Sequence, residues 1–219
     1  MPQITAGEIF QWAVKRLQIV KKQILASSNT TPVEHAVEFR QALMVAFLIS
    51  CPVRQRALLA MSVTGHVEFS GDEIFLNFRV EDMKDKKPRR IPLHGDLKCL
   101  MVEYLDVHRR VLLGGTESDM LWITARGNAY DADSFSKYLA IYTKRHFGEA
   151  FRAHKFRHIA ATHIAEEMPE RVGIIKDVLG HSTLRTAEKH YNRATALSAG
   201  RKLNALTAKY KLPKKGKKK

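Results

Sequence analysis

A run of apolar residues near the start of the chain constrains the fold more than any other feature of the sequence. Every residue from Ala42 to Leu48 is apolar, and helical spacing extends the segment from Pro32 to about Ile49. A helix that is apolar on most of its faces must be covered on all sides, so we expect it in the core. Thr31 is its predicted N-cap, with Glu34 completing a capping box, and Pro52 breaks the helix.

The remaining periodicities predict a mainly α fold with one small antiparallel β-sheet (α+β). Apolar residues at helical spacing cover Ala6 to Leu25. Between Ser62 and Leu93 the period changes to two, with a turn at Gly71-Asp72 and a short edge strand from Arg90 to Leu93. After this segment the pattern is helical again. The predicted helices there are Leu97–Leu113, a helix capped by Asp133 or Ser134 that runs to about His146, Ala153–Glu166, Val172–Leu179, Leu184–Asn192 and Ala194–Tyr210.

The length of 219 residues and the hydrophobic content of 45% suit one main domain with a short appendage. We expect a helix and linker over residues 1–30, the main domain over 31–210 and a disordered basic tail over 211–219. Cys51 and Cys99 lie in or beside apolar helical patterns, so both are predicted to be buried free thiols. The chain shows no signal peptide and no apolar run long enough to span a bilayer, which indicates a reducing, cytoplasmic setting.

The charge of the chain points to a polyanionic partner. Lys and Arg number 37 against 22 Asp and Glu, which gives a formal charge of +15. Six lysines lie among the nine C-terminal residues, yet the rest of the chain still carries +9. Nucleic acid is the commonest partner for such a basic body. Charge alone leaves two alternatives open: a soluble protein with a basic tail and no specific partner, or a protein held at an anionic membrane surface.

Four clusters of chemically capable residues follow one another along the chain. Together they indicate a tyrosine nucleophile aimed at a phosphodiester, with cations collected around the phosphate. Arginine suits such a site because its planar fork binds two phosphate oxygens, and fixed donors around the developing phosphorane are a large part of catalysis. The clusters are Arg54 beyond the core helix, the basic stretch Lys84–Arg90, His154 with Arg157 three residues later, and His181 with Tyr191.

Each member taken alone has a simpler interpretation. A lone Arg54 would be a surface arginine, and a lone Tyr191 would be a core or interface tyrosine. The basic hairpin residues could merely contact backbone phosphates. His154, His158 and His163 could be zinc ligands, but no carboxylate or thiolate lies at a recognisable spacing, so no metal site is expected.

In combination, these clusters resemble the motifs of the tyrosine recombinase (phage-integrase-like) family, in the right order, over roughly Val33 to Thr195. Alignment with the family's lysine hairpin selects Lys84 among the basic residues of its stretch. The similar segments are Cys51–Met61 for the first-arginine box, Met83–Leu93 for the lysine hairpin, His154–Thr162 for the H-x-x-R-H-x-x-A-T box, and Leu179–Ser182 with Tyr191 for the L-G-H-S…Y box.

The resemblance implies the tyrosine recombinase catalytic-domain fold and a site-specific DNA recombinase or integrase that needs no cofactor. The tyrosine would attack the scissile phosphate and form a 3′-phosphotyrosyl bond. Double-stranded DNA would be the partner, with a homo-oligomer, a tetramer, assembled on it in the nucleoid. The implied roles are Arg54 and Arg157 on the non-bridging oxygens, Lys84 as proton donor to the leaving oxygen, His154 as acceptor of the Tyr191 proton, His181 as a phosphate hydrogen-bond donor, and Arg56, Lys86, Lys87 and Arg89 as contacts to the DNA backbone.

Three features depart from the family pattern. Ala57 stands where the family usually has an acidic or other polar residue, three positions after the first arginine. The interval from His181 to Tyr191 is ten residues, one more than is usual, so we expect a one-residue adjustment before the tyrosine. Only residues 1–30 precede the catalytic-type region, so they are expected to be a remnant of, or a lead-in to, a separate DNA-binding domain, unless the chain is a minimal member.

Two alternatives to a recombinase follow from these observations. A type IB topoisomerase uses the same tyrosine, arginine, lysine and histidine set but relaxes DNA as a monomer. A non-catalytic DNA-binding protein on the same fold is the second alternative, and Ala57 favours it.

Overall fold

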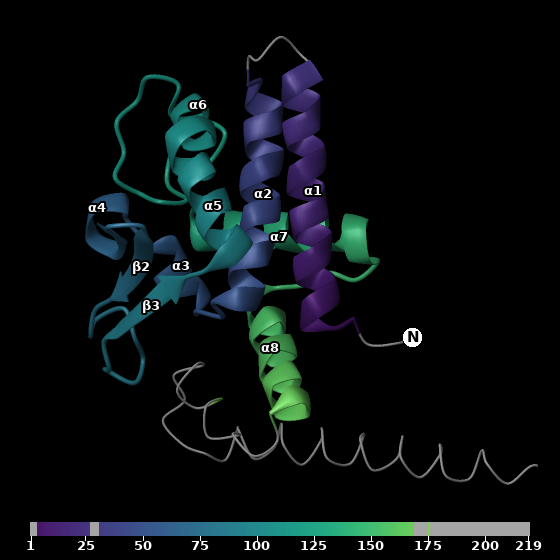
Figure 1. Ribbon diagram of the computed structural model, residues 1–219, viewed down its shortest axis with the longest axis vertical. Helices are drawn as coiled ribbons and strands as arrows, with labels where there is room; N and C mark the ends of the chain where they lie inside the picture. The colour runs from purple at the N-terminus through teal and green to yellow at the C-terminus, as the bar shows by residue number, and fades with distance from the viewer. Residues whose placement is uncertain (1–3, 27–30, 169–174, 176–219) are drawn as a thin grey trace, which may run out of the picture.

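The computed structural model describes residues 4–26, 31–168 and 175. Its mainly helical fold with one small antiparallel sheet confirms the predicted fold class (Figure 1). The helices predicted after residue 171 and the basic tail lie outside the described residues, apart from residue 175. Within the described part, no helix is long and apolar enough to cross a membrane. The elements are α1 (Ala6–Ala26), α2 (Val33–Ser50), α3 (Gln55–Leu59), α4 (Val63–His66), β1 (Val67–Ser70), β2 (Glu73–Phe78), β3 (Arg89–Leu93), α5 (Gly95–Glu103), the π-helix η1 (Tyr104–His108), α6 (Arg109–Leu113), α7 (Ala132–Phe147) and α8 (Ala153–Glu167).

Helix α2 forms the centre of the core, as predicted. All of its residues from Ala42 to Leu48 are buried. Helix α1 runs antiparallel beside it, and α5, η1, α6 and α8 also pack against it (Figure 1). From α1, the side chains of Ile9, Ala13, Leu17 and Val20 join the same hydrophobic cluster. Because several separate segments cover α2, its apolar faces are removed from water, which is the main favourable term in folding.

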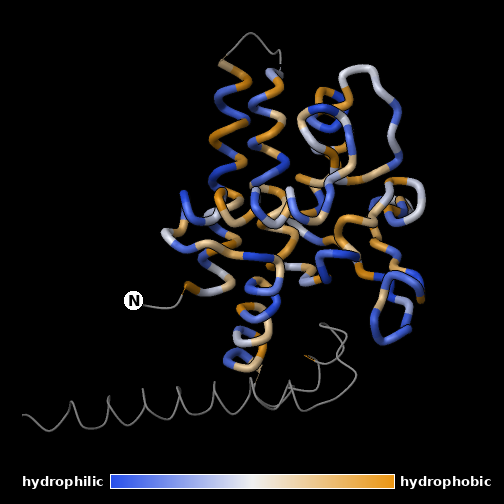
Figure 2. Tube along the Cα trace, turned by 180° about the vertical axis from the view of Figure 1, so that it is seen from behind, coloured by the Kyte–Doolittle hydropathy of each residue, from blue (hydrophilic) through white to orange (hydrophobic). Residues whose placement is uncertain are grey.

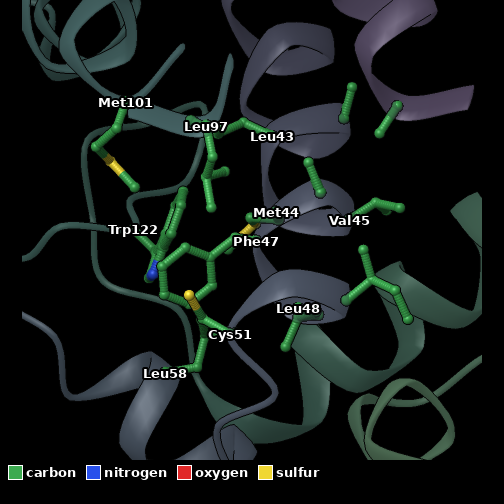
Figure 3. Packing of buried hydrophobic residues seen from close by; sticks show 14 of the residues in the cluster. Leu43, Met44, Val45, Phe47, Leu48, Cys51, Leu58, Leu97, Met101 and Trp122 are labelled. Atoms are coloured by element: carbon green, nitrogen blue, oxygen red, sulfur yellow. The ribbon is translucent and has the colours of Figure 1, made fainter. Parts of the chain in front are cut away.

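Aromatic rings fill the core beside the C-terminal half of α2. The ring of Phe47 meets Trp122 edge to face, with centroids 5.4 Å apart, and Tyr104 stacks with Trp122 at 5.5 Å. Figure 3 shows Phe47 and Trp122 packed among the apolar side chains of α2 and α5. The hydroxyl of Tyr104 donates to the carbonyl of Leu121 at 3.0 Å, so this buried polar group is satisfied.

The sheet has the strand order β1-β2-β3, and both pairs are antiparallel. The predicted turn joins β1 to β2: Gly71 has a φ of 57°, and Ser70 lies opposite Glu73. Strand β3 is the predicted edge strand, which suits Pro92 because proline has no amide hydrogen to donate. Residues 79–88 then join β2 to β3 as a polar loop, blue at the lower right of Figure 2.

Two predicted helix caps are wrong. The N-cap of α2 is Pro32, which has extended backbone angles and no capping side chain. Thr31 is therefore one residue too early for its hydroxyl to reach the amides of the first turn, and the capping box does not form. The N-cap of α7 is Asp131, whose carboxylate accepts hydrogen bonds from the amides of Asp133 and Ser134 at 3.1 and 2.8 Å. Asp133 and Ser134, the two predicted caps, are therefore the residues whose backbone amides Asp131 caps.

The helix predicted over Leu97–Leu113 starts at Gly95 and contains the π-helical turn η1, which periodicity did not indicate. Within this wider turn, the buried ring of His108 stacks on Phe39 of α2, with centroids 3.7 Å apart. The helical run ends at Leu113, as predicted, and Gly114 follows in the left-handed conformation that glycine adopts without a steric penalty.

The two cysteines differ in exposure. Cys51 is buried, as predicted, but Cys99 is exposed, so the prediction of two buried thiols is wrong. Helix α5 buries Leu97, Leu100 and Met101 and leaves Cys99 on another face. Burial raises the pKa of the Cys51 thiol to about 12, because a thiolate is poorly solvated in an apolar setting.

Phe47→Ala is expected to lower the free energy of unfolding by about 3–5 kcal/mol, because truncation leaves a cavity beside Trp122. The control is Ile141→Ala at an exposed site on α7, which should change it by less than about 0.5 kcal/mol. Urea denaturation followed by circular dichroism measures both. Equal losses in the two variants would contradict the central position of α2.

Thiol labelling should separate the cysteines. In the folded protein at pH 8, Ellman's reagent is expected to react rapidly with Cys99 alone, because Cys51 is inaccessible and its raised pKa keeps it protonated. Two thiols should react in denaturant. Cys99→Ser should remove the rapid phase; a rapid phase that survives this change would show that Cys51 is accessible.

Candidate functional site

The end of α2, the β2–β3 loop, β3 and α8 surround a cavity of about 370 Å³, here called the arginine pocket. Pro52 follows the end of α2. Arg54, two residues later, has an extended backbone conformation and is the N-cap of α3. Arg54 lines the pocket from this connection, and Arg157 lines it from α8. The fold therefore brings together two arginines that lie more than a hundred residues apart in the sequence.

Arg157 is the most deeply placed of these cations. Only 6% of its surface is exposed, and its Nη1 donates a hydrogen bond to the carbonyl of Pro52. Burial, followed by repulsion from Arg54 and Arg89, lowers the pKa of its guanidinium to about 10. Arg157 remains protonated at neutral pH, so the pocket concentrates positive charge where water screens it only in part. Such a cavity is suited to an anion.

A third arginine lines the same pocket from β3. The Nη2 of Arg89 forms an ion pair with Oδ2 of Asp85 at 2.6 Å, and both side chains are largely buried. Its neighbour Arg90 also borders the pocket, but the guanidinium of Arg90 pairs with Glu68 at 2.9 Å and lies over the ring of Phe75. Consecutive arginines on this strand therefore have different surroundings.

A second cavity of about 340 Å³, here called the lysine pocket, adjoins the arginine pocket. The two cavities share a wall made by Arg54, Ala57 and the start of the β2–β3 loop. Together they form one cationic recess. The basic residues that line the lysine pocket are Arg54, Arg56, Lys84 and Lys86.

Specific contacts hold the β2–β3 loop against the body. Asp82, which lines both pockets, accepts a hydrogen bond from the amide of Arg79 at 2.7 Å and faces Nε2 of His66 at 3.3 Å. Nδ1 of His66 accepts from the amide of Ser62 at 3.0 Å. Because Nδ1 accepts this hydrogen bond, a neutral ring carries its proton on Nε2, the nitrogen that faces Asp82.

The position three residues after Arg54 contributes no charge to the site. Ala57 is buried and lines both pockets, so its methyl group is part of their shared wall. The acidic residues near the arginines come instead from the β2–β3 loop, as Asp82 and Asp85, and neither was singled out from the sequence. The available signal was an aspartate on each side of Lys84 within a basic stretch.

Two of the predicted site residues that the structure describes lie outside both pockets. His154 is exposed on α8, and its ring packs edge to face with that of His158, with centroids 4.5 Å apart. Among the described residues, neither His154 nor Lys87 lines either pocket. His181 and Tyr191 lie outside the described residues. In the part of the chain that the structure covers, no group of three or more His, Cys, Asp or Glu side chains could hold a metal ion.

The chain is similar in sequence to one protein family and to individual members of it. Residues 18–197 match the profile described as the Phage integrase family. Tyrosine recombinase XerD of Ralstonia nicotianae is 26% identical over 82% of this chain and 63% of its own length. Tyrosine recombinase XerC of Escherichia coli is 25% identical over 68% of this chain and 47% of its own length. The chain thus spans only part of the length of both relatives.

Solved recombinase structures share the fold. XerH site-specific recombinase, bound to a palindromic difH substrate in a post-cleavage complex, has a TM-score of 0.62 at 17% identity, over 86% of this chain and 50% of that chain. XerA recombinase has a TM-score of 0.57 at 20% identity, over 83% of this chain and 57% of that chain.

Sulfate is expected to bind the arginine pocket and stabilise the folded protein, by about 1.4 kcal/mol at ten times its dissociation constant. Unfolding temperatures in sodium sulfate and sodium chloride of equal ionic strength measure the effect. Arg157→Gln should lose the site-specific part, whereas Arg110→Gln, at an exposed position on α6, should keep it. General salting-out by sulfate is common to all three proteins, so identical sulfate responses would contradict an anion site here.

Proposed function

Because the chain belongs to the phage integrase family, we propose that it is a site-specific DNA recombinase that cleaves and rejoins strands through a 3′-phosphotyrosyl intermediate. The observation that carries the proposal is the presence of Arg54 and Arg157 in one pocket, with Lys84 in the pocket that adjoins it. When no metal takes part, attack on a phosphodiester requires two phosphate-binding cations and a proton donor.

Cleavage is a displacement at phosphorus. The phenol oxygen of Tyr191 attacks the scissile phosphate and forms a P–O bond while the bond from phosphorus to the 5′-oxygen breaks. The electron pair of the broken bond leaves with the 5′-oxygen, which takes a proton from the Lys84 ammonium and departs as a hydroxyl. The phenol proton passes to His154. Rejoining is the reverse attack by a 5′-hydroxyl, and it needs no ATP because the covalent intermediate conserves the bond energy.

The arginines act on the charge that develops at phosphorus. Arg54 and Arg157 bind the two non-bridging oxygens, and His181 adds a hydrogen bond to the phosphate. Since Arg157 is buried and held by the carbonyl of Pro52, it is already oriented before DNA binds. Preorganised donors of this kind stabilise the transition state without reorganising during the reaction.

The exposure of His154 supports its role as the proton acceptor. A base on the surface of α8 can be reached by a tyrosine from a different segment, whereas a base buried beneath the arginines could not. Its contact with His158 restricts the orientation of the imidazole.

Double-stranded DNA is the proposed partner. The formal charge of +15 suits it, and XerH was solved bound to a difH substrate. The exposed side chains of Arg56, Lys86 and Lys87 are the proposed contacts to flanking backbone phosphates, and Arg89 is proposed to contact DNA phosphate from the arginine pocket. Such contacts make the affinity fall with salt concentration.

Recombination joins two DNA sites, so several copies of the protein are proposed to assemble on DNA, as a tetramer in the nucleoid. Residues 31–210 are the proposed catalytic unit. Residues 1–30 contain helix α1, which packs against α2 in the same hydrophobic core, and residues 211–219 add basic charge.

Covalent capture tests the proposal. A pool of nicked duplexes with randomised sequence is incubated with the protein, so that the short 5′-hydroxyl fragment diffuses away after cleavage and traps the adduct. A denaturing gel should show a protein–DNA adduct, and sequencing of the trapped DNA identifies the preferred site. Tyr191→Phe should abolish the adduct, Tyr138→Phe should retain it, and Arg157→Gln should slow its formation about 10²–10³-fold.

Two outcomes would overturn the proposal: no adduct with any member of the pool, or an adduct that forms equally well in Tyr191→Phe. The first, combined with duplex binding, would identify a DNA-binding protein without strand-cleavage activity.

A further inference from the structure

We propose that Arg89 is a third phosphate-binding arginine of the arginine pocket, and that Asp85 is the residue that positions it. This assignment rests on the proposed function, because it concerns the same phosphate. It goes beyond a contact to the flanking DNA backbone, since it places Arg89 on the reacting group, and it gives Asp85 a role that the sequence did not indicate.

The ion pair between Arg89 and Asp85 is largely buried. Their side chains are only 15% and 10% exposed. The adjacent residue Arg90 pairs with Glu68 instead, and the side chains of this second ion pair are 49% and 40% exposed. A surface pair is worth little, whereas a buried carboxylate fixes the direction of its guanidinium. Arg89 is therefore held in place, and it is held beside the pocket that it lines.

The pair also leaves bonding capacity unused. One edge of the guanidinium binds Asp85 through Nη2, while Nη1 of Arg89 is buried and has no hydrogen-bond partner within the described part of the chain. An unsatisfied buried donor on a charged group is unfavourable. A phosphate oxygen in the arginine pocket would satisfy Nη1, because the planar fork of arginine can bind one carboxylate and one phosphate at the same time.

The geometry of the β2–β3 loop explains why Asp85 reaches Arg89. Lys86 has a φ of 56°, and its amide donates to the carbonyl of buried Met83 at 3.2 Å. This tight turn brings Asp85 back toward the start of β3. The same turn includes Lys84, so the ion pair also anchors the segment that carries the proposed proton donor.

A third cation stabilises the transition state of the reaction more than it stabilises the ground state. A phosphodiester carries one negative charge, and its pentacoordinate transition state carries two. Arg54 and Arg157 already lie in the pocket with Arg89, and the charge of Arg89 is close enough to contribute to the lowered pKa of Arg157. Three cations around one phosphate favour the more highly charged state, which is the condition for catalysis rather than binding alone.

The test compares Arg89→Gln with Arg90→Gln. Both remove one positive charge from adjacent residues of β3, but only Arg89 has the buried pair. Cleavage of the captured site is measured at saturating DNA, and duplex affinity is measured separately. Arg89→Gln should slow cleavage about 10²-fold and weaken duplex binding less than about tenfold. Arg90→Gln should change the cleavage rate less than about threefold.

Three further variants keep the test decisive if Arg89→Gln does not fold. Arg89→Lys keeps the charge without the fork and should slow cleavage about tenfold. Asp85→Asn should also slow it about tenfold, and Asp85→Glu should recover part of the rate. An unchanged unfolding temperature separates positioning from stability. Rates for Arg89→Lys and Asp85→Asn within about threefold of wild type would overturn the assignment, as would equal effects of Arg89→Gln and Arg90→Gln.

A second measurement does not depend on cleavage. Inorganic phosphate is titrated against each folded variant by thermal shift at constant ionic strength. Loss of Arg89 should weaken the apparent phosphate affinity about tenfold or more, and loss of Arg90 should not. If the wild type forms no DNA adduct, the proposed function fails, and this titration alone decides whether Arg89 binds phosphate. If adducts form and Arg89 variants cleave normally, the function stands and the assignment of Arg89 fails.

Discussion

The hydrogen bond from Arg157 to the carbonyl of Pro52 is the contact on which the arrangement of the site depends. Pro52 follows the end of α2, so its carbonyl is not committed to a helix and can accept a bond from another segment. Helix α2 is covered by α1, α5, η1, α6 and α8, which fixes the position of its C-terminal end. The hydrogen bond transmits this position to a guanidinium on α8, the helix below the end of α2 in Figure 1.

The arginine pocket brings positively charged side chains close together, although the fold does not need them there. Arg54, Arg89 and Arg157 repel one another, and the lowered pKa of Arg157 reflects both burial and this repulsion. Taking charges out of water lowers stability, and the burial of apolar side chains in the core is the favourable term that opposes it. Such local unfavourable arrangements are typical of functional sites. A phosphate bound among these arginines would attract all three, so its binding would offset their mutual repulsion.

The basic side chains that line the two pockets were easier to predict than the aspartates beside them. Arg54 and Arg157 occur in short segments that resemble family motifs, and resemblance to the family's lysine hairpin selected Lys84 among its basic neighbours. The partners of Asp82 and Asp85 depend on the three-dimensional path of the β2–β3 loop. Asp82 faces the ring of His66, and the turn at Lys86, which has a positive φ, brings Asp85 to Arg89. The exposed Cys99 has a similar explanation, since periodicity predicts that α5 is helical without stating which flanking positions its neighbours cover.

Composition and spacing were enough to establish the helical class, the apolar central helix, the small sheet with its proline-bearing edge strand, and the order of the motifs. These properties depend on local propensity and on the contrast between apolar and polar residues, which can be read along the chain. Packing in three dimensions was needed to join Arg54, Arg89 and Arg157 around one cavity, to turn Asp85 toward Arg89, and to leave His154 on the surface. Contacts between distant segments depend on the rotation of each helix and the path of each loop, and no single stretch of residues encodes them.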